Sequence, residues 1–209
     1  MLAAVDLQCI RGERTLFTGL AFTVQAGDLL RVAGANGQGK TSLLRMLCGL
    51  LSPTEGEVRW KGSTIQRLRE EYWRELLYIG HANAVKDDLT ALENVMTACA
   101  LAGLEAGHEQ AGTALRQLGL AGCERLPARV LSQGQRRRVA LTRLALSEQL
   151  PLWILDEPFT ALDTAAVSYV REAIERQVAR GGAVIYTTHQ DAGIAAARSW
   201  SIDLDRGGR

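Results

Sequence analysis

A glycine-rich stretch at residues 34–42 constrains the fold of this chain more than any other part of its sequence. The stretch fits the pattern G-x-x-x-x-G-K-[ST] and consists of Gly34, Ala35, Asn36, Gly37, Gln38, Gly39, Lys40, Thr41 and Ser42. An apolar run at 29–33 precedes it, and a helical pattern of apolar residues at 43–47 follows it. A strand, a glycine loop and a helix in this order predict a phosphate-binding loop. A chance glycine-rich turn is the alternative, which the flanking segments disfavour.

The residue types in this loop suit a magnesium-bound nucleoside triphosphate. Glycines let backbone amides surround the phosphates, because no Cβ blocks the required dihedral angles. The helix that follows offers free N–H groups and the positive end of its dipole. We expect Lys40 to reach the β- and γ-phosphates and the Thr41 hydroxyl to hold Mg²⁺.

The bulk properties exclude several other classes of protein. The chain has 209 residues, of which 47% are apolar, and this suits one α/β domain with a real core. The net charge of +1 gives no basic field for nucleic acid. No apolar run approaches the roughly 20 residues of a membrane span, and the start does not resemble a signal peptide. The four scattered cysteines fit reduced thiols in a cytoplasm.

Periodicity predicts a mixed order of strands and helices. Residues 1–33 alternate and turn like antiparallel strands, and 57–60 predicts another short strand. Apolar runs predict further strands at 76–79, 152–155 and 183–186, and a helix is expected from about 164 to 179. Residues 89–125 are rich in helix-forming residues, and we interpret them as a helical subdomain.

Three polar side chains follow two of the predicted buried strands. Asp156 and Glu157 end the strand at 152–155, and His189 follows the strand at 183–186. Ligands bind at the carboxyl ends of strands in open α/β sheets. We expect Asp156 to hold Mg²⁺ or its water, Glu157 to polarise the attacking water, and His189 to face the γ-phosphate. Solvated strand-end acids and a structural histidine are the alternatives.

A capping sequence opens a further helix. Ser132 and Gln135 fit S-x-x-Q, a capping box that by itself explains both residues. The same helix start can also bind an anion. Arg136, Arg137 and Arg138 come next, and we interpret them as a solvated helix face rather than a nucleic-acid contact.

Taken together, these motifs resemble the nucleotide-binding domain of ATP-binding cassette (ABC) transporters over essentially the whole chain. In the family's order they are similar to Walker A (34–42), the signature motif (131–135, with Gln133 where glycine is usual), Walker B (152–157), the D-loop (161–163, ending in Asp163) and the switch histidine, His189. The resemblance implies one ABC ATPase domain over 1–209. It would have a P-loop NTPase core of mostly parallel sheet flanked by helices, an N-terminal antiparallel β part and a helical subdomain at about 82–135.

The resemblance also implies ATP and Mg²⁺ as cofactors and a head-to-tail homodimer. In such a dimer, Walker A of one subunit and the signature of the other close on one ATP. Ser132, Gln133, Gly134 and Gln135, together with Asp163, would then contact nucleotide. Binding would close the dimer, hydrolysis would loosen it, and the cycle would pull on an integral membrane permease.

Two positions depart from the family pattern. His81 stands where the family's Q-loop glutamine is expected, and its imidazole can still bond the lytic water or a metal-bound water. Counting back from Walker A places Arg11 near the position of the aromatic residue that stacks on adenine, with Phe17 a few residues on. A guanidinium can stack on a ring. An exposed arginine at a strand turn is the equal alternative for Arg11.

Within the family, four segments resemble the ATPase subunits of the bacterial haem exporter used in cytochrome c maturation. They are 78–81, 89–94, 153–163 and 187–190. The resemblance implies membrane partners of the CcmB and CcmC type, at the cytoplasmic face of the inner membrane. ATP hydrolysis would then drive haem delivery or release of a haem chaperone. We expect no direct haem binding, because the sequence has no C-x-x-C-H.

Other functions stay open beside this one. An exporter of lipoproteins, peptides or drugs is the nearest alternative, and an ATP-gated assembly switch on a membrane complex is another. A DNA-repair or translation ABC protein would need tandem cassettes or a coiled-coil insertion, which the sequence lacks.

Overall fold

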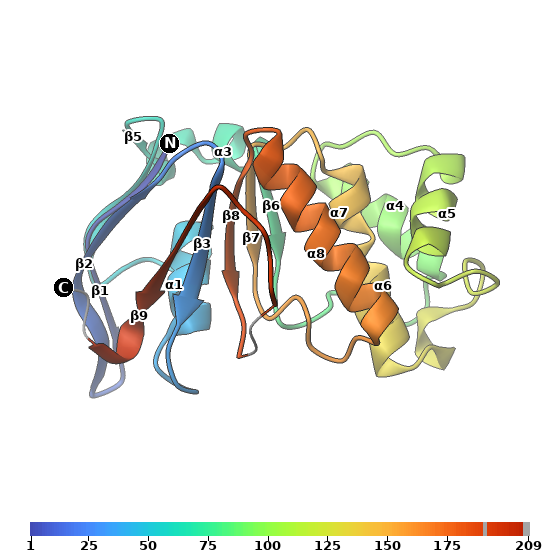
Figure 1. Cartoon of the computed structure of the whole chain (residues 1–209), viewed down its shortest axis with the longest axis horizontal. Helices are drawn as coiled ribbons and strands as arrows, with labels where there is room; N and C mark the ends of the chain where they lie inside the picture. Colours follow the sequence, from blue (N-terminus) through green and yellow to red (C-terminus); the bar gives the residue numbers. More distant parts are fainter. Residues whose placement is uncertain (190–191, 207–209) are drawn as a thin grey trace.

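The N-terminal strands of the computed structural model form an antiparallel sheet (Figure 1). The structure describes residues 1–189 and 192–206. In sheet order, the strands are β2 (Arg14–Val24), β1 (Leu2–Arg11), β4 (Glu55–Trp60) and β5 (Ser63–Thr64). Leu2, Ala4, Leu7 and Cys9 of β1 are all buried, so much of its apolar side faces the core. The antiparallel strands predicted near the N-terminus are confirmed.

A second, parallel sheet forms the centre of the fold. Its order is β6 (Leu76–Ile79), β7 (Leu152–Leu155), β8 (Ala183–Thr187), β3 (Asp28–Ala33) and β9 (Arg198–Asp203). Every residue of β7 and β8 is buried, which explains their continuous apolar runs. The predicted α/β class is confirmed, with one difference. The segment at 28–33 joins this parallel sheet and pairs with β8 and β9.

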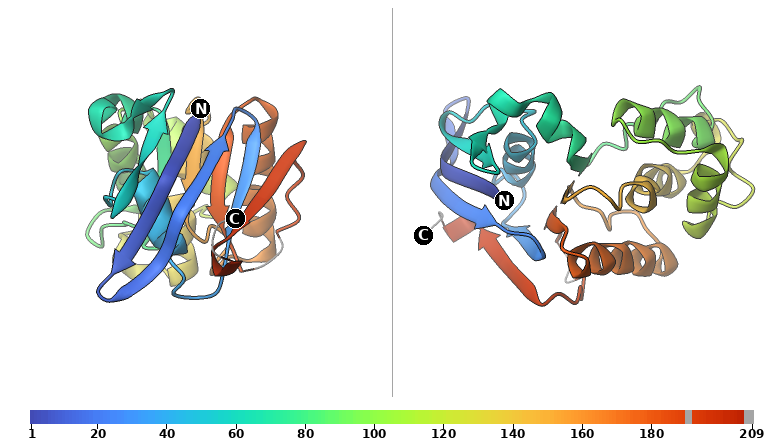
Figure 2. Two further views of the ribbon diagram at one scale, coloured as in Figure 1. Left: turned by 90° about the vertical axis from the view of Figure 1, so that its left-hand side faces the viewer. Right: turned by 90° about the horizontal axis from the view of Figure 1, so that it is seen from above.

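Helices cover both faces of the parallel sheet (Figures 1 and 2). In chain order they are α1 (Lys40–Leu47), α2 (Ile65–Leu68), α3 (Glu70–Arg74), α4 (Ala91–Leu101), α5 (His108–Gln117), η1 (Ala128–Val130), α6 (Gln133–Leu141), α7 (Arg143–Leu146), α8 (Thr164–Ala179) and η2 (Leu204–Arg206). α8 has the predicted bounds. Asp163 caps its start by accepting a hydrogen bond from the Ala166 N–H at 2.8 Å. No helix within the described residues has the length and apolar character needed to cross a membrane.

Three apolar clusters hold these layers together. Leucines of α1 pack between the two sheets, and residues of α7 and α8 pack on the other face of the parallel sheet. A third cluster lies among α4, α5 and α6 and includes Val95, Leu115 and Val139. These helices gather at one side of the molecule (Figure 2). The division of the chain into a core and a subdomain at about 82–135 stays a prediction.

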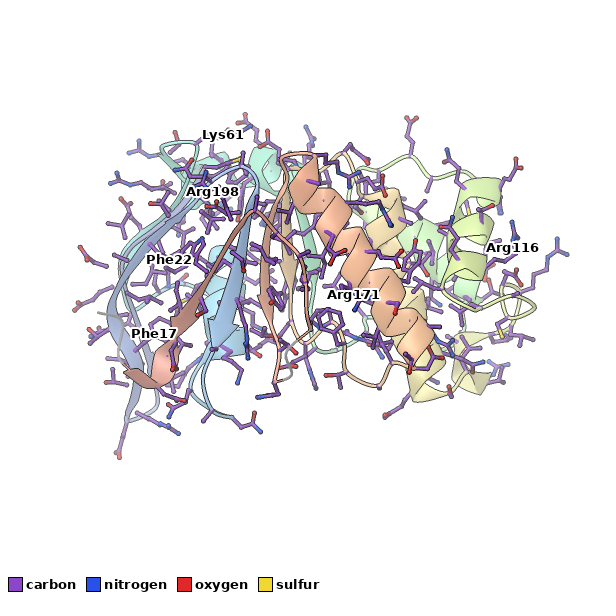
Figure 3. All side chains as sticks on the ribbon, in the orientation of Figure 1. Phe17, Phe22, Lys61, Arg116, Arg171 and Arg198 are labelled. Carbon is purple, nitrogen blue, oxygen red and sulfur yellow. The ribbon has the colours of Figure 1, made fainter. Side chains whose placement is uncertain are left out.

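The edge strand β9 joins the C-terminal part to the rest of the fold. Arg198, labelled in Figure 3, lies 2.9 Å from Asp28 at the start of β3, measured from Nε to Oδ1. Phe22 of β2 meets Trp200 of β9 edge to face, with ring centroids 6.1 Å apart. β9 therefore touches both sheets.

Strand register determines where the functional segments meet. Val32 of β3 is level with Thr187 of β8, and Leu155 of β7 is level with Tyr186 of β8 and Ile79 of β6. Because the strands are parallel, the segments that follow them all leave the sheet at the carboxyl-terminal ends of the strands.

Candidate nucleotide site

A cavity of about 340 Å³ lies at the carboxyl-terminal ends of the strands in the parallel sheet. Its lining includes Lys40, Thr41, His81, Asp156, Glu157 and His189. These residues follow β3, β6, β7 and β8, strands that are far apart in the sequence. The fold thus brings the residues predicted to handle phosphate, metal and water to one place.

The glycine loop has the backbone conformation that its sequence predicts. Gly34, Gly37 and Gly39 have φ of 139°, 80° and 98°, where other residues are strained. A Cβ on Gly39 would lie 3.1 Å from the Leu16 Cβ, so a side chain there would also have to displace Leu16 slightly. Lys40 is 8% exposed, and its Nζ donates hydrogen bonds to Gly34 O at 2.7 Å and to the Ala35 carbonyl. The ammonium group therefore lies within the loop, where it can bind an anion.

Two oxygen-bearing side chains suited to a metal ion lie beside the loop. The Thr41 hydroxyl donates to Asp156 Oδ2 at 2.8 Å, and Asp156 is only 1% exposed. A hydroxyl and a carboxylate are the hard oxygen donors that Mg²⁺ prefers, so the residues fit this ion. The described part of the chain holds no cluster of three or more His, Cys, Asp or Glu residues for a metal. A magnesium ion here would complete its shell with phosphate and water.

Glu157 has an unusual backbone and a nearby histidine. Its φ is 50°, in the left-handed region that costs a non-glycine residue free energy. Its Oε1 is buried and lies 3.2 Å from His189 Nε2. This contact does not have the geometry of a hydrogen bond. Among the described residues, Oε1 therefore has no hydrogen-bond partner. A carboxylate oxygen free to accept a proton beside a phosphate site is what a general base needs.

Thr187 holds the two acidic residues in place. Its hydroxyl donates to Asp156 Oδ1 at 2.8 Å and accepts from the Glu157 N–H at 2.9 Å, and the Thr187 side chain is fully buried.

Thr187→Val keeps the shape of the side chain and removes both hydrogen bonds. We expect a loss of about 1–3 kcal/mol in the free energy of unfolding, because a buried donor and acceptor lose their partner. Urea unfolding measures this loss, and an unchanged midpoint would contradict it.

A model of the ABC transporter family matches residues 17–160. This chain belongs to the ABC transporter family. Family membership makes it an ATP-binding protein and an ATPase.

Curated relatives show which kind of ABC ATPase this chain is similar to. It is 56% identical over 191 residues to the "Cytochrome c biogenesis ATP-binding export protein CcmA" of Nitrosomonas europaea. The alignment covers 91% of this chain and 89% of that relative. The protein of the same name in Nitrosospira multiformis is 54% identical, and the alignment covers 97% of this chain and 98% of that relative. The CcmA of Pseudomonas aeruginosa is 46% identical over 95% of this chain.

Solved structures of ABC cassettes have the same fold. An ATP-binding subunit of an ABC transporter superposes with a TM-score of 0.80 at 27% identity, covering 90% of this chain and 79% of that one. A dimeric cassette in a post-hydrolysis state bound to ADP and Pi superposes with a TM-score of 0.81 at 24% identity. The match covers 98% of this chain and 95% of that one. At that identity the likeness concerns the fold alone.

Arg11 is not brought to the cavity of this ABC ATPase. It is exposed at the end of β1, level with Arg14 across the hairpin, and is not among the described residues that line the cavity. Arg14 Nη2 instead donates to Gln38 Oε1 of the loop at 3.0 Å, and Leu16 lines the cavity. The role of Arg11 in stacking on adenine stays a prediction.

The signature residues lie outside the cavity of their own chain. The capping box is confirmed: Ser132 N donates to Gln135 Oε1 at 2.8 Å, and Gln135 N donates to Ser132 Oγ at 3.2 Å. Ser132 and Gln133 are exposed. A Cβ on Gly134 would lie 3.0 Å from Ala161 O, so the signature and the D-loop are neighbours.

The arginine triplet is not a uniform solvated face, and that interpretation is wrong for Arg137. Arg136 pairs with Asp87 at 2.8 Å, and Arg138 lies 3.4 Å from Asp163. Arg137 between them is 4% exposed. Burial lowers the pKa of its guanidinium, and the negative charges of Asp156 and Glu157 oppose that shift. No local sequence pattern signals this inward contact.

Proposed function

We propose that this chain is the ATP-hydrolysing subunit of a membrane complex that delivers haem, or releases a haem chaperone, for cytochrome c maturation. One observation carries the ATPase mechanism: the glycine loop, the two acids after β7 and the histidine after β8 line one cavity. The assignment to cytochrome c maturation is supported by relatives of that description at 46–56% identity.

Each residue of the cavity has a role in the proposed reaction. The amides of residues 34–42 and the Lys40 ammonium bind the phosphates, and Thr41 with Asp156 holds Mg²⁺. The metal, when bound, neutralises phosphate charge. Glu157 Oε1 takes a proton from the attacking water, while His189 and His81 face the terminal phosphate. His189 Nε2 lies 3.2 Å from that oxygen, so the two proposed functional side chains are neighbours in the cavity.

The complete site would need two copies of the chain. The cavity of their own subunit is not lined by Ser132, Gln133, Gly134 and Gln135, nor by Asp163. In the proposed head-to-tail dimer they contact the nucleotide held by the other copy. Two solved cassettes of this fold are described as dimers, which supports pairing of two copies.

An apolar groove is the proposed contact with membrane proteins of the CcmB and CcmC type. It has a volume of about 340 Å³ and is lined by residues that include Tyr78, Ala84 and Lys86. Its rim exposes Leu50 and Trp73 at 53% each and Leu101 at 85%. Exposed apolar side chains around a groove favour a protein partner. The chain would then lie at the cytoplasmic face of the inner membrane, with His81 on the segment between groove and cavity.

A genetic replacement tests the proposed function. A strain that carries only the Glu157→Gln form should lose haem-stained c-type cytochromes, because the complex binds ATP without turning it over. Haemoproteins with non-covalently bound haem should stay at normal levels. The wild-type gene, reintroduced, is the control.

Two outcomes would contradict this assignment. Normal c-type cytochromes together with a defect in lipoprotein, peptide or drug export would indicate another exported substrate. Normal cytochromes with full release of the haem chaperone would indicate an ATP-gated switch that does not need hydrolysis.

A further inference from the structure

Arg137 of α6 connects the signature helix to two other segments of the site. Its Nη1 donates to Gly80 O at 2.8 Å and to Asn83 Oδ1 at 3.3 Å. Its Nη2 donates to Asp156 O at 2.9 Å and to Glu157 O at 2.8 Å. The two ends of one guanidinium therefore bind the segment after β6 and the segment after β7.

The geometry of these contacts requires an arginine. A planar guanidinium offers donors in a rigid fork, so it can bridge two pairs of acceptors, whereas an ammonium is a single point charge. The side chain is buried, and its Nε has no hydrogen-bond partner within the described residues. A buried cation held mainly by carbonyl oxygens is costly to maintain, which argues for a role beyond stability.

The contact with Glu157 falls where the backbone is strained. Glu157 has φ of 50°, and such a conformation persists only when its surroundings fix it. Its N–H is bound by Thr187 at 2.9 Å and its carbonyl by Arg137 at 2.8 Å. These two hydrogen bonds fix both peptide planes of Glu157 and thereby the direction of its side chain.

We propose that Arg137 is a positioning residue for ATP hydrolysis, which holds the Glu157 carboxylate and the segment carrying His81 in register with the signature helix. The inference rests on the proposed role of Glu157 as the group that activates water. It also gives a physical link between the groove and the cavity, because the segment that begins at Gly80 continues to Ala84 and Lys86 of the groove.

Arg137→Lys tests this role in the full-length chain. Lysine keeps the charge but cannot span both pairs of acceptors, so Glu157 loses its fixed direction. We expect kcat for ATP to fall by about 10- to 100-fold, in the range that a misplacement of the order of 1 Å costs. KM for ATP and the affinity for a non-hydrolysable analogue should change less than about 2-fold, since the phosphate loop is untouched.

Arg143→Lys is the matched control. Arg143 is a partly buried arginine on α7. Among the residues that the structure describes, it donates to one carbonyl, Tyr78 O at 3.2 Å, and its Nε has no hydrogen-bond partner. It should keep the wild-type kcat. Arg137→Gln, which removes the charge and keeps one short donor, replaces Arg137→Lys if that variant does not fold and should show the same split between kcat and KM.

The outcomes separate this inference from the proposed site. A wild-type kcat in a folded Arg137 variant, or an equal loss in Arg143→Lys, would overturn the positioning role. A loss that follows only the fraction unfolded at the assay temperature would overturn it too. If Glu157→Gln also leaves kcat unchanged, the proposed role of Glu157 fails first, and the two failures are thus distinguishable.

Discussion

Glu157→Gln should lower the ATP turnover of the purified chain by about 10²-fold or more, because it removes the proposed general base. Glutamine has nearly the same shape, so the left-handed backbone at this position and its hydrogen bonds to Thr187 and Arg137 should persist. ATP binding should be kept. A variant that binds ATP without hydrolysing it should also accumulate as a dimer. Phosphate release measures the turnover, and analytical ultracentrifugation with ATP measures the dimer.

Glu172→Gln controls for the loss of a carboxylate elsewhere. Glu172 lies on α8, where it forms an exposed pair with Arg176 at 3.8 Å. This variant should turn over ATP at the wild-type rate and stay monomeric to the same extent. Unchanged turnover in Glu157→Gln would remove Glu157 from the mechanism.

Lys40→Met should weaken nucleotide binding by about 10- to 100-fold, as expected when a charged group loses a hydrogen-bonded partner. The methionine stem fills the same space, so the loop keeps its packing. The cation that lies 2.7 Å from Gly34 O, inside the loop, is lost. Titration with a fluorescent ATP analogue measures the affinity directly. Turnover at sub-saturating ATP should fall by at least the same factor.

Lys61→Met is the control for the loss of one positive charge. Lys61, labelled in Figure 3, follows β4 and pairs with Glu75 at 2.8 Å. Its replacement should leave nucleotide affinity unchanged. An equal loss of affinity in both variants would show that overall charge, rather than the position of Lys40, attracts the nucleotide.

The parts of the fold marked by local signals were predictable from the sequence. α8 begins and ends at the predicted residues because an aspartate caps its start and two glycines follow its end. β7 and β8 were predictable because buried parallel strands have continuous apolar runs. β9 was missed: its residues are exposed or half-buried, and it exists because it pairs with β3, which is remote in the sequence.

The same distinction applies to the site. Lys40, Asp156 and His189 each lie within or just after a strand–loop pattern, so their convergence follows from parallel strand order alone. Arg137 depends on acceptors 19 to 57 residues away, and no local pattern signals them. Asp205 is a further case: its Oδ2 accepts a hydrogen bond from Ala35 N at 2.9 Å across 170 residues. Such contacts require the tertiary structure.

The proposed mechanism requires one magnesium nucleotide to be held between the glycine loop and the carboxyl ends of β7 and β8. A crystal structure of the Glu157→Gln chain with ATP and Mg²⁺ tests it most directly. We expect the metal at about 2.1 Å from the Thr41 hydroxyl, with Asp156 bound to it directly or through one water. The terminal phosphate should lie beside His189 and meet Ser132 of a second copy. A nucleotide bound in the apolar groove, or a metal held by neither Thr41 nor Asp156, would contradict this mechanism.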